Sequence, residues 1–259
     1  MLRAERQAKI LQMVRDRGFI ENDELMALFN TSHVTIRRDL INLADQGLIK
    51  LEHGGATSIN YLEGVPEPLY ETKLYFRSEE KKAIVLQAMT IIKDGDILFL
   101  DSGTTNFRLA SILKTSRLNK LTIITSDLMV AKELSPNPQI TTIILGGLVR
   151  RSFYNTYGPY TEIILDNLKA NKFFLGFDGA TINRGPSNTV LEEVPIKQKM
   201  ISISDETIAL ADATKFGMDA PYAICGWEKI NRVITDSTLS MEYKQFFKDK
   251  GIELSIATV

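Results

Sequence analysis

Residues 31–56 read TSHVTIRRDLINLADQGLIKLEHGGA, and the first half of this stretch has the pattern of a capped helix. Ser32 is a residue type that caps helix N-termini, because its hydroxyl accepts a hydrogen bond from a free backbone N–H. Ile36, Leu40 and Leu43 follow at spacings of four and three, which places them on one face of a helix. The stretch therefore predicts an amphipathic helix that begins after Ser32 and packs its apolar face into a small core.

The second half of the stretch predicts a short hairpin. Gly47 suits the end of the helix, since glycine readily adopts the left-handed conformation that closes a last helical turn. Residues 48–51 (Leu-Ile-Lys-Leu) are typical of a strand, and residues 53–56 (His-Gly-Gly-Ala) are typical of a tight turn.

Two further helices are expected upstream. Residues 5–17 carry apolar side chains at helical spacing, and Gly18 follows them. Asn22 or Asp23 can cap a second helix that ends at a turn before Ser32. Three helices followed by a hairpin are typical of a winged helix-turn-helix domain, which we expect over residues 1–57.

The predicted third helix has a polar side that suits DNA. In helix-turn-helix domains the start of this helix enters the major groove, where arginine bonds guanine and hydroxyl groups bond bases or phosphates. The hairpin would form a wing whose glycines let the backbone approach DNA closely. The candidate DNA-binding residues are Ser32, His33, Thr35, Arg37, Arg38, His53, Gly54 and Gly55.

Net charge gives no support of its own to DNA binding. The chain holds 31 Lys+Arg and 32 Asp+Glu, a formal charge of -1, and residues 1–57 hold eight of each kind. A strongly basic surface is the usual electrostatic signature of a nucleic-acid-binding domain, so the prediction depends on local features. From the residues alone, a protein-docking module remains an alternative for this domain.

The pattern changes near residue 58. Residues 58–77 contain Gly64, Pro66 and Pro68 and show no clear periodicity. Because proline disfavours the helical conformation of the residue before it, we expect an extended linker over these residues.

Helical and strand patterns alternate from residue 78 onward. A helix is expected over residues 79–92, and strands over residues 96–100, 121–125, 141–145, 172–177, 207–211, 232–235 and 253–257. The strands are nearly continuous runs of Ile, Leu and Phe, which indicates a parallel sheet buried on both faces. The alternation predicts an α/β domain over residues 78–259.

Polar turns follow several of the predicted strands. The carboxyl ends of parallel strands meet at one edge of a sheet, where ligands of open α/β sheets bind. Hydroxyls and backbone N–H groups at the start of a helix can hold a phosphate, and a lysine adds positive charge. The set suits a phosphorylated polyol or sugar, although each turn alone is also an ordinary helix cap or surface turn. The candidates from these turns are Asp101, Ser102, Gly103, Thr104, Thr105, Ser126, Asp127, Gly146, Gly147, Asp178 and Lys215.

The motifs in both halves of the chain resemble the DeoR family of bacterial transcription regulators. The helix motif matches at Ser32, Thr35, Ile36, Arg37, Arg38, Asp39, Leu40, Leu43, Gly47 and Ile49, and His-Gly-Gly-Ala follows at residues 53–56. The resemblance implies operator DNA as a partner. We expect a structural role for Asp39, which would pair with a neighbouring arginine and fix its rotamer.

The same resemblance extends to the second domain. Its turns look like those of the family's sugar-phosphate sensor domain, whose fold resembles ribose-5-phosphate isomerase and glucosamine-6-phosphate deaminase. Glu193 and Lys197 match a further family motif and join the effector-binding candidates. The family often has Thr-Asn where this chain has Thr125-Ser126, followed here by the acidic Asp127. This difference leaves the identity and the phosphorylation of the effector open.

Composition excludes several classes of protein. Cys225 is the single cysteine, and the two histidines, His33 and His53, lie far from it in sequence, so no disulfide within the chain and no metal site is expected. No apolar run approaches the length of a membrane span and the first residues lack the apolar core of a signal peptide. We expect a soluble cytoplasmic protein without a cofactor.

These observations predict a DNA-binding transcription regulator. The specific expectation is a homo-oligomeric repressor of a carbohydrate-utilisation operon that binds double-stranded operator DNA and is released by a phosphorylated sugar. The alternative is a sugar-phosphate isomerase or deaminase with a DNA-binding extension. No histidine lies beyond residue 53, so such an enzyme would need Asp101, Asp178 or Glu193 as its base, and we expect no catalytic residue.

Overall fold

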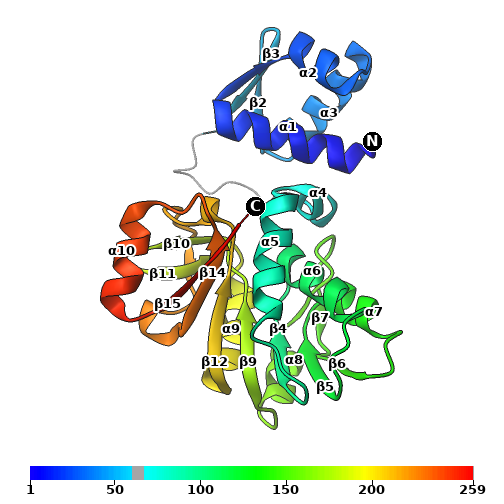
Figure 1. Cartoon of the computed structure of the whole chain (residues 1–259). Helices are drawn as coiled ribbons and strands as arrows, with labels where there is room; N and C mark the ends of the chain where they lie inside the picture. The colour runs from blue at the N-terminus through cyan, green and yellow to red at the C-terminus, as the bar shows by residue number, and fades with distance from the viewer. Residues whose placement is uncertain (60–66, 259) are drawn as a thin grey trace. The chain divides into compact units, whose positions relative to one another are not determined.

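The structure, a computed structural model, describes residues 1–59 and 67–258. The chain divides into two compact units, Met1–Ser78 and Glu79–Val259 (Figure 1). Within the described residues, no helix combines the length and the apolar character that crossing a membrane would require.

The first unit is a winged helix-turn-helix domain, as the sequence predicted. Its helices are α1 (Arg3–Arg17), α2 (Asn22–Phe29) and α3 (His33–Asp45), and its strands are β1 (Phe19–Glu21), β2 (Ile49–Glu52) and β3 (Gly55–Ser58). The strands form an antiparallel sheet in the order β1-β3-β2. Apolar side chains from all three helices and from the sheet share one core, which holds α3 against α1.

The ends of two of these helices agree with the sequence prediction, and one differs. Ser32 caps α3 by accepting a hydrogen bond from the Thr35 N–H at 3.4 Å, and Gly18 ends α1 with a φ of 82°. The cap expected from Asn22 or Asp23 is wrong, because β1 runs directly into α2 and Glu21 takes the N-cap position without a side-chain bond. The Asn22 N–H instead donates to the carbonyl oxygen of Gly54 at 2.8 Å.

The extended linker expected over 58–77 is wrong in its second half. Residues 60–66 lie outside the described part, but Tyr70–Tyr75 form helix α4, which packs against α1. Tyr70 is buried in this helix, and the ring of Phe76 just beyond it enters the core of the first unit under the guanidinium of Arg15. Burial of these two aromatic side chains outweighs the weak local pattern.

The second unit is built on a parallel sheet of seven strands in the order β15-β14-β12-β9-β4-β5-β6. These strands are β4 (Ile97–Leu100), β5 (Leu121–Thr125), β6 (Ile140–Ile144), β9 (Ala170–Leu175), β12 (Ser204–Leu210), β14 (Arg232–Asp236) and β15 (Glu253–Ala257). Every neighbouring pair in the sheet is parallel, which confirms the α/β prediction.

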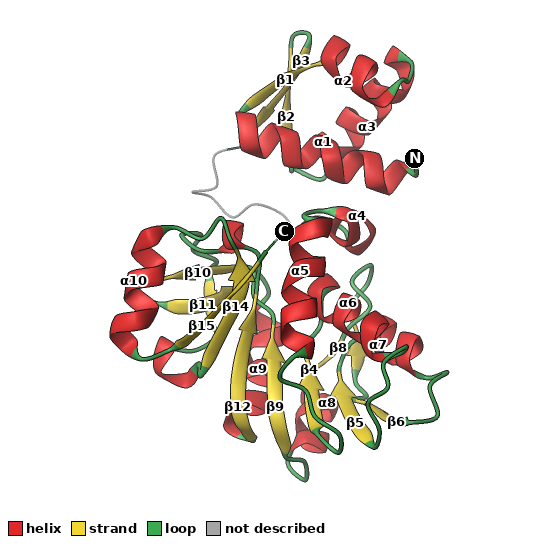
Figure 2. Cartoon of the chain, viewed as in Figure 1, coloured by secondary structure: helices red, strands yellow, loops and turns green. Residues whose placement is uncertain are grey.

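Helices cover both faces of this sheet (Figure 2). One layer consists of α5 (Ser78–Met89), α6 (Thr104–Leu113) and α7 (Leu128–Leu134), and the other of α8 (Pro159–Leu165), α9 (Val194–Ser202) and α10 (Met241–Lys250). Successive strand side chains point to opposite layers: Leu98 and Leu100 pack with the first, and Phe99 with the second.

Short antiparallel strands that the sequence did not reveal lie outside the main sheet. They are β7 (Leu148–Val149) paired with β8 (Thr156–Tyr157), and β10 (Gly179–Thr181), β11 (Gly185–Asn188) and β13 (Tyr222–Ala223) in a second small sheet. Each has at most four residues, which is too short for a periodic signal.

The strand order reverses between β4 and β9. From β4 the chain adds β5 and β6 on one side, and then β9, β12, β14 and β15 on the other. Ligands of open α/β sheets bind beyond the carboxyl ends of the strands at such a reversal. The residues that follow β4 and β9 are therefore the first place to look for an effector site.

Candidate DNA and effector sites

The start of α3 presents basic side chains to solvent. His33, Arg37 and Arg38 are exposed, and their side chains make no hydrogen bond or ion pair within the described part of the chain. On the opposite side of the helix, Ile36 and Leu40 are buried in the core. The basic side of α3 is therefore accessible to a partner, and its contact with DNA stays a prediction.

Ser32 and Thr35, also predicted as DNA contacts, have a defined role within the helix. Their hydroxyl oxygens lie 3.1 Å apart, and the Ser32 hydroxyl also accepts the Thr35 N–H. Both groups thus stabilise the first turn of α3.

Asp39 joins α3 to α1. Its buried carboxylate accepts hydrogen bonds from Arg6 Nε at 2.6 Å and from Gln7 Nε2 at 3.1 Å, and Arg3 Nε lies 3.4 Å away. Asp39 does pair with arginine, but the expectation of a neighbouring arginine is wrong: both arginines come from α1. A hollow between the two helices is lined by Arg3, Arg6, Thr35, Arg38, Asp39, Ile41, Asn42 and Asp45, so α1 adds cations beside α3. The sequence did not reveal this contribution because it depends on tertiary placement.

The two glycines of the wing differ in environment. Gly54 is exposed at the turn with a φ of 79° and open space around it, and His53 beside it is exposed. Gly55 is buried, and a Cβ there would lie 2.2 Å from the carbonyl oxygen of Ile20. This glycine therefore allows β3 to pack against β1, a role that the sequence did not reveal, and its contact with DNA stays a prediction.

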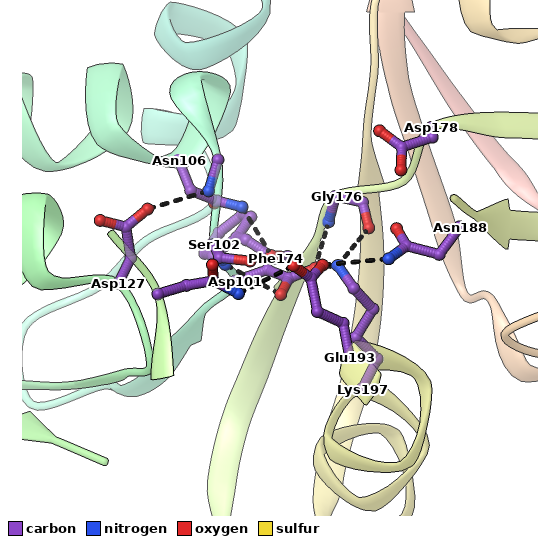
Figure 3. Close-up of polar contacts among 12 residues, drawn as sticks. Asp101, Ser102, Asn106, Asp127, Phe174, Gly176, Asp178, Asn188, Glu193 and Lys197 are labelled. Atoms are coloured by element: carbon purple, nitrogen blue, oxygen red, sulfur yellow. Dashed lines mark hydrogen bonds and ion pairs between the residues drawn. The ribbon is translucent and has the colours of Figure 1, made fainter. Parts of the chain in front are cut away.

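A buried ion pair occupies the point where the strand order reverses (Figure 3). Asp101 follows β4, and its carboxylate receives Lys197 Nζ from α9 at 2.5 Å and the Gly176 N–H, beyond β9, at 2.9 Å. Lys197 Nζ also donates to the Gly176 carbonyl oxygen at 3.0 Å. Asp101 and Lys197 are 2% and 3% exposed, so the pair connects β4, β9 and α9 away from bulk water.

Burial and charge act on this pair in opposite directions. Burial raises the pKa of Asp101, and the Lys197 ammonium opposes that shift. Burial would by itself lower the pKa of Lys197, but the carboxylates of Asp101 and Glu193 outweigh it and the pKa is raised. Lys197 therefore keeps its proton and remains a cation inside the site.

Asp127 closes the neighbouring turn. It caps α7 by accepting the N–H groups of Met129 and Val130 at 2.8 and 3.1 Å, and its second oxygen accepts the Gly103 N–H at 3.0 Å. Burial raises its pKa to about 6, although the three N–H groups lower it. Asp127 thus joins the turn after β5 to the start of α6.

Glu193 gathers three polar side chains that the sequence did not single out. Its carboxylate accepts hydrogen bonds from Arg150 at 2.9 Å, Asn155 at 2.9 Å and Asn188 at 3.0 Å. Arg150 and Asn155 belong to the loop between β7 and β8, and Asn188 ends β11. Glu193 therefore connects this loop to the helix that carries Lys197.

The remaining candidates are distributed along the same edge of the sheet. Thr104 accepts a hydrogen bond from the buried Lys81 at 2.9 Å, and Ser126 is buried, with its carbonyl oxygen bound by the Thr156 N–H. Ser102, Gly103 and Thr105 are half-buried at the start of α6. They are the members of the first turn that retain access to solvent.

Other candidates are less closely associated with the ion pair. Asp178 accepts the N–H and hydroxyl of Thr189 at 2.9 and 2.7 Å, and Lys215 follows β12, two strands from Asp101. A Cβ on Gly147 would lie 2.2 Å from Thr161 Oγ1, so this glycine allows α8 to pack against the turn that it shares with Gly146. Among the described residues, no cluster of three or more His, Cys, Asp or Glu side chains could hold a metal ion.

Both units of the chain are similar to known protein domains. Residues 6–61 match the model of the DeoR-like helix-turn-helix domain, and residues 77–237 match that of the DeoR C terminal sensor domain. An HTH-type transcriptional regulator of Bacillus subtilis, YulB, is 34% identical over 98% of this chain and 97% of its own length. A putative aga operon transcriptional repressor of Escherichia coli is 28% identical over 97% and 93%.

Among solved structures, ribose 5-phosphate isomerase A of Neisseria gonorrhoeae covers 57% of this chain and 56% of its own, with 11% identity and a TM-score of 0.40. The sequence relatives match along nearly the whole chain. The helix-turn-helix model matches its first unit and the sensor-domain model its second unit. The chain belongs to the DeoR family of HTH-type transcription regulators.

Proposed function

We propose that this regulator is a repressor of a carbohydrate-utilisation operon and that a phosphorylated sugar releases it from operator DNA. The observation that carries the proposal is the buried Asp101–Lys197 pair beside the start of α6, at the reversal of strand order. The name of the Escherichia coli relative, a putative operon repressor, supports the sign of regulation.

The start of α6 supplies the groups that a phosphate needs. The first N–H groups of a helix have no acceptor within it and carry a partial positive charge. The Gly103 N–H is taken by Asp127 and the Thr104 hydroxyl by Lys81, so the phosphate would use the N–H groups that follow Gly103 and the half-buried hydroxyl of Thr105. Lys81 and Lys197 add positive charge nearby, while sugar hydroxyls would meet carboxylate and amide oxygens.

Effector binding in the second unit can act on the DNA affinity of the first unit, to which it is covalently joined. The coupling free energy required is about 1–3 kcal/mol, which changes affinity by several-fold to roughly a hundredfold. An effector supplies this free energy if it binds the DNA-free protein more tightly than the DNA-bound protein. By linkage, DNA then weakens effector binding by the same factor.

Titration calorimetry of the full chain tests the effector class. We expect one member of a panel of sugar phosphates to bind and its unphosphorylated form to bind at least tenfold more weakly. Thr105→Val should weaken binding of the phosphorylated form, and Thr115→Val, just beyond the other end of α6, should not. Equal binding of both forms would contradict a phosphate site at α6.

The chain's residues favour a sensor over an enzyme. A general base must reach the reacting sugar carbon, but each of the three candidate carboxylates is engaged: Asp101 with Lys197, Asp178 with Thr189, and Glu193 with three side chains. We propose that this domain binds its ligand without turning it over. Isomerase or deaminase turnover by the purified chain, lost in Asp101→Asn, would contradict this proposal.

DNA reading by α3 is tested at Arg37. If its guanidinium bonds a guanine, Arg37→Ala should weaken specific binding by about 1–3 kcal/mol and relax the sequence preference at one position. Lys50→Ala, an exposed cation in β2 that pairs with Glu52, is the matched control and should leave the sequence preference unchanged. Unchanged binding by both variants would favour a protein-docking role for this unit.

We also propose that the regulator is a homo-oligomer that pairs through α8. Tyr160, Ile163 and Ile164 form an exposed apolar stripe on this helix, and Leu148 and Val149 of β7 are 56% exposed. Glu162 is the one charged residue of α8, so this face suits a second copy of itself in a two-fold interface. Paired copies would also match paired half-sites on DNA.

Sedimentation analysis tests this surface. Ile163→Glu should shift the chain towards monomer, because each interface would bury two new charges. Leu86→Glu, at an exposed leucine of α5, is the matched control and should leave the oligomeric state unchanged. An unchanged oligomer in Ile163→Glu would contradict pairing through α8.

A further inference from the structure

The DNA-facing side of α3 carries an exposed apolar residue between its cations. Val34, in the first turn of the helix, is 57% exposed. Ile36, Leu40 and Leu43 fill the core from the other side, so Val34 cannot reach it by a rotamer change. A single exposed apolar side chain is ordinary on a protein surface, so it is the position of Val34, in the first turn of α3 between exposed basic residues, that points to a partner.

The neighbours of Val34 define what that partner is. Arg37 and Arg38 lie three and four residues further along the helix, where side chains are adjacent on the surface, and both are exposed. The Thr35 hydroxyl is engaged with Ser32 in the cap. Val34 therefore lies where the first turn of α3 would meet base edges, next to two guanidinium groups that suit guanine or phosphate.

The major groove offers one apolar group that fits this position. Of the four bases, thymine alone presents a methyl group at its edge, and aliphatic side chains contact it. We propose that Val34 reads the 5-methyl group of a thymine within one or two base pairs of the contact made by Arg37 or Arg38. The inference rests on DNA binding by the family and adds a specificity-determining residue and the base that it reads.

The test removes the methyl group from DNA without changing any hydrogen bond. The full chain's binding site in its own upstream DNA is first located by footprinting, and each thymine in it is then replaced by deoxyuridine. Burial of one methyl group accounts for about a fourfold change in affinity. We expect a loss of about fourfold at one thymine per half-site, and little change at thymines outside the contact.

The variant Val34→Ala shows whether this residue makes the contact. It should weaken binding to the unmodified site by several-fold and lose the penalty for deoxyuridine at that thymine, so the two changes are not additive. Leu28→Ala removes a leucine of α2 that is equally exposed, 57%, and should keep the full penalty. Circular dichroism of both variants should match that of the unchanged chain, because neither side chain belongs to the core.

The outcomes separate this inference from the regulator function. Specific binding without any thymine that is sensitive to methyl removal would overturn it, and so would a full deoxyuridine penalty in Val34→Ala. Failure of the unchanged chain to prefer any DNA sequence would instead contradict the DNA-binding function itself, and this inference with it.

Discussion

At the scale of single residues, buried charges are the most informative feature of the second unit. Asp101, Asp127, Glu193 and Lys197 are all buried, and each is held by hydrogen bonds or an ion pair. Removing water from a charge is costly unless partners replace it, so the free energy of such groups depends on those partners. Two predictions follow at this scale.

Lys197→Met should destabilise the second unit by about 3–5 kcal/mol, because it leaves the Asp101 carboxylate buried without its cation. The deficit should shrink at low pH, where Asp101 takes up a proton. Urea unfolding followed by fluorescence of Trp227, the single tryptophan, reports on this unit alone. Lys199→Met, on the same helix and paired with Asp166 at the surface, should cost no more than about 1 kcal/mol. Equal losses of unfolding free energy in the two variants would show that the buried Asp101–Lys197 pair stabilises the unit no more than a surface pair does.

Asp127 should give the second unit a distinct pH dependence. Its pKa rises from 3.8 to about 6 on folding, so the native state holds the proton more tightly than the unfolded chain. Its stabilising contribution is full below about pH 4 and is lost as pH rises through about 6, a change of about 3 kcal/mol. Asp127→Asn removes the titration, so the difference in unfolding free energy between the variant and the unchanged chain should vary over this range. A difference that stays constant from pH 4 to 7 would show that Asp127 has an ordinary pKa.

At the scale of elements, the structure depends on close approaches that only glycine permits. β3 lies against β1 at Gly55, and the turn at Gly147 lies against Thr161 of α8. Both pairs pack more closely than a Cβ would allow.

Gly55→Ala should therefore disrupt the wing. The new Cβ would meet backbone, the Ile20 carbonyl oxygen at 2.2 Å, which cannot move aside as a flexible side chain could. We expect faster amide hydrogen exchange in β1 and β3, and weaker DNA binding. Gly54→Ala, next to it in open space with a φ of 79°, should cost only about 1–2 kcal/mol of backbone strain. If Gly54→Ala disturbed the strands more than Gly55→Ala, the packing explanation would be wrong.

Elements with a strong local signal were the ones that the sequence could predict. The cap at Ser32, the apolar face of α3 and the continuous apolar strands of the main sheet all depend on neighbours within a few residues. Helix α4 and the short strands of the second unit were missed, because burial against distant elements stabilises them. The sequence also could not show that Gly55 is a packing residue.

In the candidate effector site, too, the sequence predicted the residues from local motifs but not the contacts between them. Asp101, Asp127, Glu193 and Lys197 were found through strand-end turns and a family motif, but their mutual contacts were not. Asn155 and Arg150 reach Glu193 across 38 and 43 residues of sequence, so no local pattern connects them. Arg3 and Arg6 likewise reach Asp39 from another helix.

At the scale of the whole molecule, the two units supply the two binding functions of a regulator. The first presents a basic helix start and a wing, and the second holds a charged cluster at the edge of a parallel sheet. A formal charge of -1 means that overall attraction to DNA is weak, so specific contacts must carry much of the preference for an operator.

Fluorescence anisotropy of the full chain on its own upstream DNA tests the central claim most directly. Salt must be fixed, because protein–DNA affinity depends steeply on it. We expect tighter binding to one segment of that DNA than to random sequence, and release of this complex by a phosphorylated sugar but not by its unphosphorylated form. Specific binding released equally by both forms would contradict the phosphate site. No preference over random DNA would contradict the account of this chain as a sugar-phosphate-controlled regulator.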